Sequence, residues 1–267
     1  MDYGFNIGFY AKTLGMPTAA KLVAEAGFTH LDYTPPVAQE DWRQTMQAHL
    51  GIFADFGLTV HQTHAPFNRY NHHGDQHLLR LQRVAEATEA MGARFMVVHG
   101  DEFNFAEREF DPEAALQYNH DLFLPYVESG GYRVAFETVF EDLKRRRFTS
   151  QAEELLALIR SFDSENAVCC WDTGHGHVSF KRKAPEIIRQ FGSLIQCTHV
   201  HDNAGNDAHQ MPMTGDIDWR ATVEALKEGG YSGVWSVEYA HGRLCQELIP
   251  QYLRLSFLAA QKSWEQP

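Results

Sequence analysis

Several segments of this sequence have the pattern of a buried β-strand and end in a side chain that can bind a divalent metal ion. A carboxylate at the end of an apolar strand is costly unless it is paired, hydrogen-bonded or coordinated. Because these side chains lie at the same end of their strands, we expect the strands to converge on one polar site. Glu, Asp and His are the ligand types of a Mn, Zn, Co or Mg site. The segments are Arg94–His99, Tyr132–Glu137, Ala167–Asp172, Leu194–His199 and Val234–Glu238, with Val60–His64 as a sixth candidate.

Residue counts along the strands select the members of this site. Glu137 lies six residues after Gly131, and the same count from Ser193 on the seventh strand selects His199. His201 lies two residues further on and on the same face of the strand, so it remains the alternative. Polar residues that merely lie in solvent at strand ends would not need to fall at the same distance from the start of their strands. The equal distances therefore favour a shared site.

A second group of potential ligands lies in the loops beyond the strands. His175 follows an inward-facing aspartate by three residues, and Asp207 and His209 form an Asp-x-His pair that can chelate an ion from one short loop. The spacing permits a second metal site but does not require one, because a solvated loop has the same composition. His64 and His99 are expected beside these residues, either as further ligands or as hydrogen-bond donors to a substrate.

Eight β-rich runs alternate with helical patterns from one end of the chain to the other. A glycine closes the preceding helix at six of the seven joints, and only the joint at 162–166 lacks one. Eight such units without a linker predict a single (β/α)8 TIM barrel that forms one domain over residues 1–267. A doubly wound sheet would place ligands at one switch point rather than at the ends of six strands. The runs begin near Phe5, Thr29, Leu58, Arg94, Tyr132, Ala167, Leu194 and Val234.

Alternation along the strands supports the barrel. If Glu137 points into the barrel, Ala135 does so too, while Val134 and Phe136 face the surrounding helices. The side chains of the sixth and eighth strands alternate between the two faces in the same way, with the large apolar side chains on the helix-facing side.

Composition limits the compartment and the partners. The net charge of −12 opposes a general affinity for nucleic acid or anionic membranes, and a small uncharged substrate fits it better. The four cysteines lack metal or disulfide spacing, and the N-terminus lacks the pattern of a signal peptide, so we expect a cytoplasmic protein. No apolar run approaches the roughly 20 residues that cross a bilayer. The oligomeric state stays open, with a homo-oligomer among the options.

The sequence lacks the residues and motifs that several other enzyme chemistries require. No lysine ends a strand, with Lys12 the nearest, so a Schiff-base aldolase has no visible nucleophile. There is no glycine-rich phosphate loop, no GxGxxG followed by an acidic residue and no GxSxG elbow. We therefore expect no organic cofactor.

Taken together, these features resemble the xylose-isomerase-like TIM-barrel superfamily. It includes sugar isomerases, ketose 3-epimerases, inosose dehydratases and AP endonucleases of the endonuclease IV type. The resemblance extends over essentially the whole chain. The matching pieces are His64-Ala65-Pro66-Phe67, Glu137, Asp172-Thr173-Gly174-His175, His199-Val200-His201-Asp202-Asn203, Asp207-Ala208-His209, Gly215-Asp216-Ile217-Asp218-Trp219 and Glu238.

The resemblance to ketose 3-epimerases implies one divalent metal held by Glu137, Asp172, His199 and Glu238, with His175 in contact with the sugar. The two glutamates would also exchange a proton with the substrate. A divalent ion that bridges a carbonyl and a neighbouring hydroxyl acidifies the C–H bond between them and stabilises an enediolate. Carboxylates on opposite faces can then remove and return the proton. The expected function is that of a metal-dependent sugar or cyclitol isomerase or epimerase, with related dehydratases included.

Two positions depart from the relatives. Val139 stands where enzymes similar to xylose isomerase carry a lysine, which favours the enediolate over a hydride shift. Gly205 stands where the epimerases place an arginine, which leaves the substrate contacts open. A non-enzymatic sugar-binding module would not need two metal-bound glutamates facing one cavity.

The endonuclease IV branch is the alternative function. Such enzymes act on abasic DNA with three zinc ions, and this sequence has each ligand type in matching order. DNA binding also needs basic loops at the barrel mouth. Arg69 and Tyr70 are candidates, but Asp101, Glu107 and Glu109 crowd the fourth loop, so nucleic acid is not the expected partner. The matching ligands are His64, His99, Glu137, Asp172, His175, His199, Asp207, His209 and Glu238.

Overall fold

The computed structural model of the chain describes residues 1–66, 74–100, 102–104, 110–141, 145–240, 242 and 244–265. Arg69, Tyr70, Asp101, Glu107 and Glu109 lie outside these described residues. Among the helices in the described ranges, none is long and apolar enough to cross a membrane.

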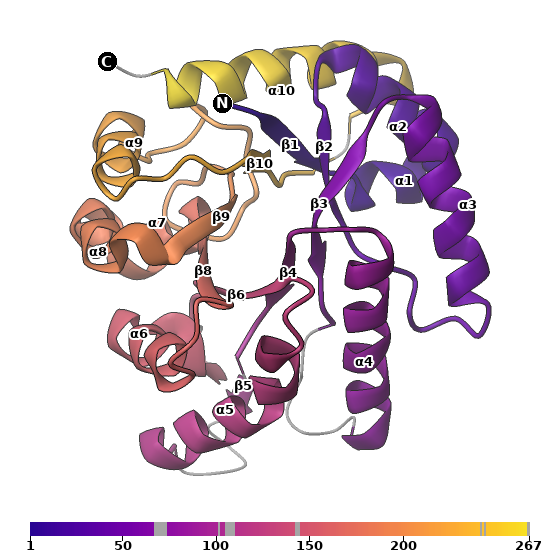
Figure 1. The fold of residues 1–267 in the computed structure, drawn as a ribbon. Helices are drawn as coiled ribbons and strands as arrows, with labels where there is room; N and C mark the ends of the chain where they lie inside the picture. The colour runs from indigo at the N-terminus through magenta and orange to yellow at the C-terminus, as the bar shows by residue number, and fades with distance from the viewer. Residues whose placement is uncertain are drawn as a thin grey trace.

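Eight parallel strands form the central sheet (Figure 1). The two strands at the ends of the hydrogen-bonded order meet through Val200, whose N–H donates to Ser236 O at 2.8 Å and whose carbonyl accepts from Glu238 N at 2.9 Å. The sheet therefore curls into a nearly closed barrel, and the predicted (β/α)8 TIM-barrel fold is confirmed. In sheet order the strands are β10 (Trp235–Val237), β1 (Tyr3–Asn6), β2 (His30–Tyr33), β3 (Thr59–His64), β4 (Phe95–Val98), β6 (Arg133–Glu137), β8 (Ala167–Asp172) and β9 (Ile195–His199).

Helices surround the barrel and connect its strands (Figure 1). Gly27 ends the second helix with a φ of 114°, a backbone conformation that glycine adopts at low cost. At the joint without a glycine, Asp163 takes the left-handed conformation instead, with a φ of 46°. The helices are α1 (Gly8–Leu14), α2 (Met16–Ala26), α3 (Trp42–Asp55), α4 (Gly74–Ala90), α5 (Pro112–Glu128), α6 (Ala152–Ser161), α7 (Thr173–Phe180), α8 (Ala184–Phe191), α9 (Trp219–Glu228) and α10 (Ile249–Trp264). Short 3-10 turns lie at Phe148–Ser150, Lys181–Lys183, Gly192–Leu194 and Gln246–Leu248.

The core has an inner and an outer part, as the alternation along the strands predicts. Ala135 and Cys170 belong to a small apolar cluster inside the barrel. Val134, Phe136 and Trp171 belong to the larger cluster between the strands and the helices. The inner cluster fills the barrel below its carboxyl end, and the predicted ligand residues lie at that end. Its members are Phe95, Val97, Ala135, Val168, Cys170 and Cys197.

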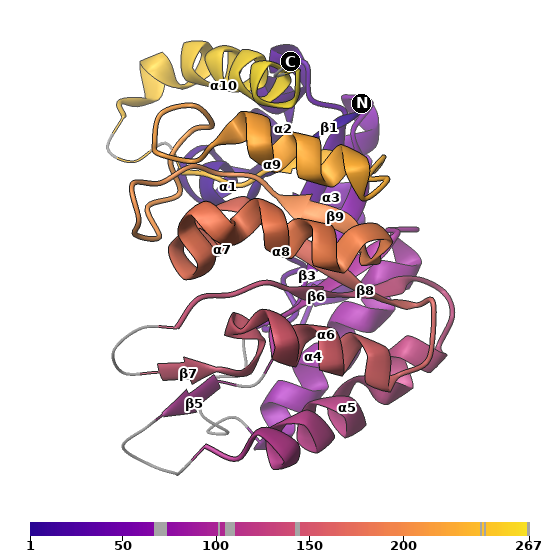
Figure 2. The same ribbon diagram turned by 90° about the vertical axis from the view of Figure 1, so that its left-hand side faces the viewer.

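A small antiparallel ribbon, absent from the sequence-based prediction, stands apart from the barrel strands (Figure 2). It pairs β5 (Glu102–Asn104) with β7 (Arg145–Arg147). These strands follow β4 and β6, so the ribbon extends from the carboxyl end of the barrel, where the polar strand ends lie.

Candidate metal centre

The polar strand ends meet at the carboxyl end of the barrel. Glu137, Asp172 and His199 are the last residues of β6, β8 and β9, and Glu238 directly follows β10. Glu137, Asp172 and His199 are at most 1% exposed, and the side chain of Glu238 is 13% exposed. Each of the four offers a ligand atom within 4.8 Å of the others. The structure thus brings together the four residues that the sequence predicts as first ligands, and their role as ligands stays a prediction.

His199 lies between the two glutamates of this group. Its Nδ1 is 3.2 Å from Glu137 Oε1 and 3.1 Å from Glu238 Oε2, while Asp172 Oδ2 lies 4.0 Å away. Of the two histidines that the sequence leaves open, this geometry places His199 between the glutamates, and its role as the ligand stays a prediction. The ring of His201 instead donates to Asp172 Oδ2 at 3.1 Å.

A second group shares Glu137 with the first. The Oε2 atom of Glu137 lies 3.1 Å from His64 Nε2 and 2.9 Å from His99 Nε2. These three residues also place one ligand atom each within 4.8 Å of the others. A single buried carboxylate therefore connects two sets of potential metal ligands.

A third group lies in the loops, where the sequence places its second set of ligands. His175 Nε2 and His209 Nε2 lie 3.7 and 3.2 Å from Asp207 Oδ1. His201 joins them, with its ring stacked on that of His209 at a centroid distance of 4.1 Å. One ligand atom from each of the four residues lies within 4.8 Å of the others.

A fully buried carboxylate behind the first group is absent from the sequence-based prediction. Asp32 Oδ2 lies 2.8 Å from His199 Nε2 as an ion pair, and it accepts hydrogen bonds from Asn6 Nδ2 at 3.3 Å and Gln62 Nε2 at 3.4 Å. Asn6 Nδ2 also donates to Glu238 Oε1 at 3.2 Å. With Nε2 held by Asp32, His199 presents Nδ1 to the two glutamates. An aspartate inside the apolar second strand was the signal that could have revealed it.

Charge in this cluster is balanced between carboxylates and histidines. Burial alone would raise the pKa of Glu137, but His199 and His99 hold it well below its ordinary value. Burial alone would lower the pKa of His199, but Glu238 and then Glu137 raise it well above its ordinary value. In the same way, neighbouring carboxylates outweigh burial and raise the pKa of His175 to about 10. Protonated histidines thus compensate the buried carboxylates.

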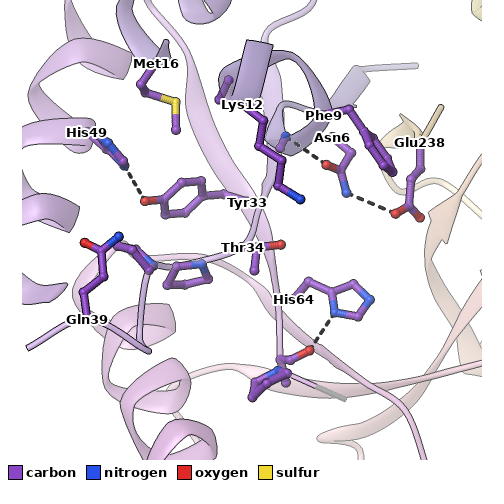
Figure 3. A pocket seen from close by; sticks show the side chains of 16 residues that line it. Asn6, Phe9, Lys12, Met16, Tyr33, Thr34, Gln39, His49, His64 and Glu238 are labelled. Atoms are coloured by element: carbon purple, nitrogen blue, oxygen red, sulfur yellow. Dashed lines mark hydrogen bonds between the residues drawn. The ribbon is translucent and has the colours of Figure 1, made fainter. Parts of the chain in front are cut away.

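A cavity of about 710 Å³ opens beside the first group (Figure 3). Glu238 and His64 line it on one side, and Phe9, Lys12 and Tyr33 line it elsewhere. A small molecule in this cavity would lie directly against one glutamate of the cluster.

Comparison with known families agrees with this architecture. A sequence profile described as xylose isomerase-like TIM barrel matches residues 20–256. The chain belongs to this family. Among curated proteins, y4fM of Sinorhizobium fredii, itself uncharacterized, is 25% identical over 247 residues, which cover 81% of this chain and 78% of the relative.

Several solved structures share the fold at low sequence identity. D-psicose 3-epimerase from Clostridium cellulolyticum H10, crystallised with D-tagatose, has a TM-score of 0.78 at 14% identity and covers 99% of this chain and 100% of its own. The IOLI protein, whose crystal structure contains a zinc atom, has a TM-score of 0.73 at 18% identity and covers 98% and 96%. At these identities the likeness establishes the fold.

The glycine of the Asp-Thr-Gly-His segment has no room for a side chain. A Cβ on Gly174 would lie 1.9 Å from Cε1 of His201, whose ring packs against the start of α7. We predict that Gly174→Ala displaces this ring and lowers the free energy of unfolding by about 1–3 kcal/mol, measured by denaturant titration. Gly51→Ala is the control, because a Cβ there meets nothing within 4 Å and alanine favours the helix. Equal stability of both variants would contradict the crowding around His201.

Proposed function

We propose that this protein is a metal-dependent sugar or cyclitol isomerase or epimerase that works by proton transfer. The observation that carries the proposal is the group formed by Glu137, Asp172, His199 and Glu238, which places one ligand atom of each residue within 4.8 Å of the others beside a cavity of about 710 Å³. Neighbours with the same fold include epimerases of D-psicose and L-ribulose, which supports this class of substrate.

The donor set fits a divalent cation. Three carboxylates and an imidazole are ligands that Mn, Zn, Co or Mg accept, with Zn and Mn suited to the mixed set. In the protein alone, protons on His199 and its neighbours balance these carboxylates. A cation can replace those protons, because ligating histidines must be neutral. Such an ion would supply polarisation of the substrate carbonyl and stabilisation of the enediolate.

The protein's own residues would bind the substrate and move the proton. Glu238 faces the cavity, so its carboxylate would lie against one side of a bound sugar. Glu137 lies deeper, fully buried, where His64 and His99 hold its Oε2 and leave Oε1 towards His199. One glutamate would remove the proton from the carbon beside the carbonyl, and the other would return it from the opposite face.

The test of the mechanism is isotope exchange with solvent. Turnover of the correct ketose in deuterated water is expected to place deuterium on the carbon next to the carbonyl, detected by NMR or mass spectrometry. A panel of ketoses and inososes locates the substrate. A hydride shift would keep the substrate's own hydrogen and leave little solvent label. Turnover without label would therefore overturn the proton-transfer mechanism and keep the isomerase assignment.

A metal-dependent phosphodiesterase is the second candidate, and one observation favours it. Glu137 joins the first group to His64 and His99, and a third group follows at His175, His201, Asp207 and His209, so the residues could hold more than one ion. Cleavage of an oligonucleotide with an abasic site, without exchange on any sugar, would establish this function and overturn the sugar enzyme. Metal analysis of protein purified without added metal gives the number of ions independently.

The domain organisation and the compartment are part of the proposal. Structural neighbours of nearly the same extent support one TIM-barrel domain over residues 1–267. Cysteine usage supports a cytoplasmic location.

A further inference from the structure

The cavity beside the candidate metal centre has a lysine in its wall. Lys12 lies in the last turn of α1, directly after β1, and lines the cavity together with Tyr33 and Thr34. Figure 3 shows its side chain extending into the cavity between Tyr33 and the Glu238 side of the wall. The amino group therefore faces whatever molecule occupies this space.

Lys12 is the one lysine or arginine among the described residues that line this cavity. The His49 ring, which contacts Tyr33 in the same cavity wall, does not add positive charge at neutral pH, because burial lowers its pKa. The phenol of Tyr33, 2.6 Å from His49 Nδ1, stays neutral because burial raises its pKa. At this end of the cavity the local charge is therefore positive, while Glu238 and the ligand cluster occupy the other side.

The amino group of Lys12 has no ion-pair or hydrogen-bond partner among the described residues of the protein. Some exposed basic side chains pair with carboxylates, as Lys21 does with Glu25 at 3.8 Å. Within the part of the chain that the structure describes, no carboxylate lies within 4.0 Å of Lys12 and no hydrogen bond holds its amino group. Most of the remaining wall is apolar, including Phe9, Met16 and Pro36. An apolar wall with one free ammonium group is suited to a ligand with one charged end.

We propose that Lys12 binds an anionic group, carboxylate or phosphate, at the end of the substrate away from the metal ligands. This inference rests on the proposed function, in which the reacting end of the sugar lies against Glu238. It adds the class of substrate, which is a sugar acid or sugar phosphate rather than a neutral sugar. The net charge of −12, which by itself favours an uncharged substrate, does not exclude an anionic one. Repulsion between a ligand and distant surface charges is screened over about 8 Å in physiological salt, so the groups in contact decide.

Binding of unreactive polyols to metal-free protein tests the inference without turnover. D-Glucitol, D-gluconate and D-glucitol 6-phosphate are titrated calorimetrically into the wild type, Lys12→Met, Lys12→Arg and Lys21→Met. We expect at least one anion to bind about tenfold more tightly than neutral glucitol, a charge-assisted contact of ordinary strength. The preference should disappear in Lys12→Met and persist in Lys12→Arg and in the surface control Lys21→Met. The tighter of the two anions identifies a carboxylate or a phosphate as the natural group.

Three results would overturn the inference: equal binding of glucitol and both anions, no binding of either anion, or a preference that survives Lys12→Met. Failure of the proposed function gives a different pattern. In that case the anion preference of Lys12 remains, but no sugar acid or sugar phosphate exchanges hydrogen with deuterated water. Conversely, efficient exchange on a neutral ketose that is unchanged in Lys12→Met would keep the isomerase and discard the anionic substrate.

Discussion

Replacing Glu137 by glutamine is expected to remove bound divalent metal from the purified protein and to lower turnover about a thousandfold. The carboxylate belongs to both groups of potential ligands at the strand ends, and its two oxygens lie within 3.2 Å of four histidine nitrogens. An amide has no negative charge to attract a cation. A loss of several kcal/mol of electrostatic stabilisation corresponds to this factor in rate. Metal content by mass spectrometry and turnover of the identified ketose measure the two effects.

Glu165→Gln is the matched control for this substitution. Its carboxylate is 89% exposed and makes only a 3.7 Å ion pair with Arg133, so metal content and turnover should stay at the wild-type level. Full metal occupancy in Glu137→Gln would show that metal binding does not depend on the charge of this carboxylate. Retained metal with lost turnover would instead leave it only the proton-transfer role.

Replacing Asp32 by asparagine is expected to weaken metal binding about 10–100-fold, the usual effect of losing a partner that orients a metal ligand. Asp32 holds Nε2 of His199 at 2.8 Å and directs Nδ1 towards the glutamates. Asparagine has nearly the same shape, so Asn6 and Gln62 keep a neighbour of similar size. We therefore expect the metal-free variant to unfold within a few degrees of the wild type, while its metal affinity, measured by competition with a chelating dye, falls.

Asp202→Asn separates orientation from simple structural support. Asp202 is also fully buried at this end of the barrel, but it accepts from Trp219 Nε1 at 2.9 Å and from backbone N–H groups. Its loss should lower stability and leave affinity at the Glu137 group unchanged. If both variants reduce affinity equally, or if Asp32→Asn leaves it unchanged, Asp32 does not act through His199.

The sequence alone was sufficient to predict the barrel and the meeting point of its polar side chains. The reason is periodicity: alternation with period two assigns Ala135 to the interior and Phe136 to the helices, and both assignments are confirmed. Because parallel strands in a barrel end on the same side, a carboxylate or histidine at the end of each strand must approach the others. Glu137 and His199, six residues beyond their joints, come within 3.2 Å of each other for this reason.

Only the tertiary structure decided the arrangement inside that site. His199 and His201 share a face of one strand, so sequence spacing cannot separate them. Contacts with distant residues do: Asp32, 167 positions before His199 in the chain, holds one ring, and the stacked His209 holds the other. The position of Lys12 against the cavity likewise depends on how α1 packs across the barrel mouth. Local patterns determine which face a side chain occupies, whereas its partners on that face come from segments that only folding brings together.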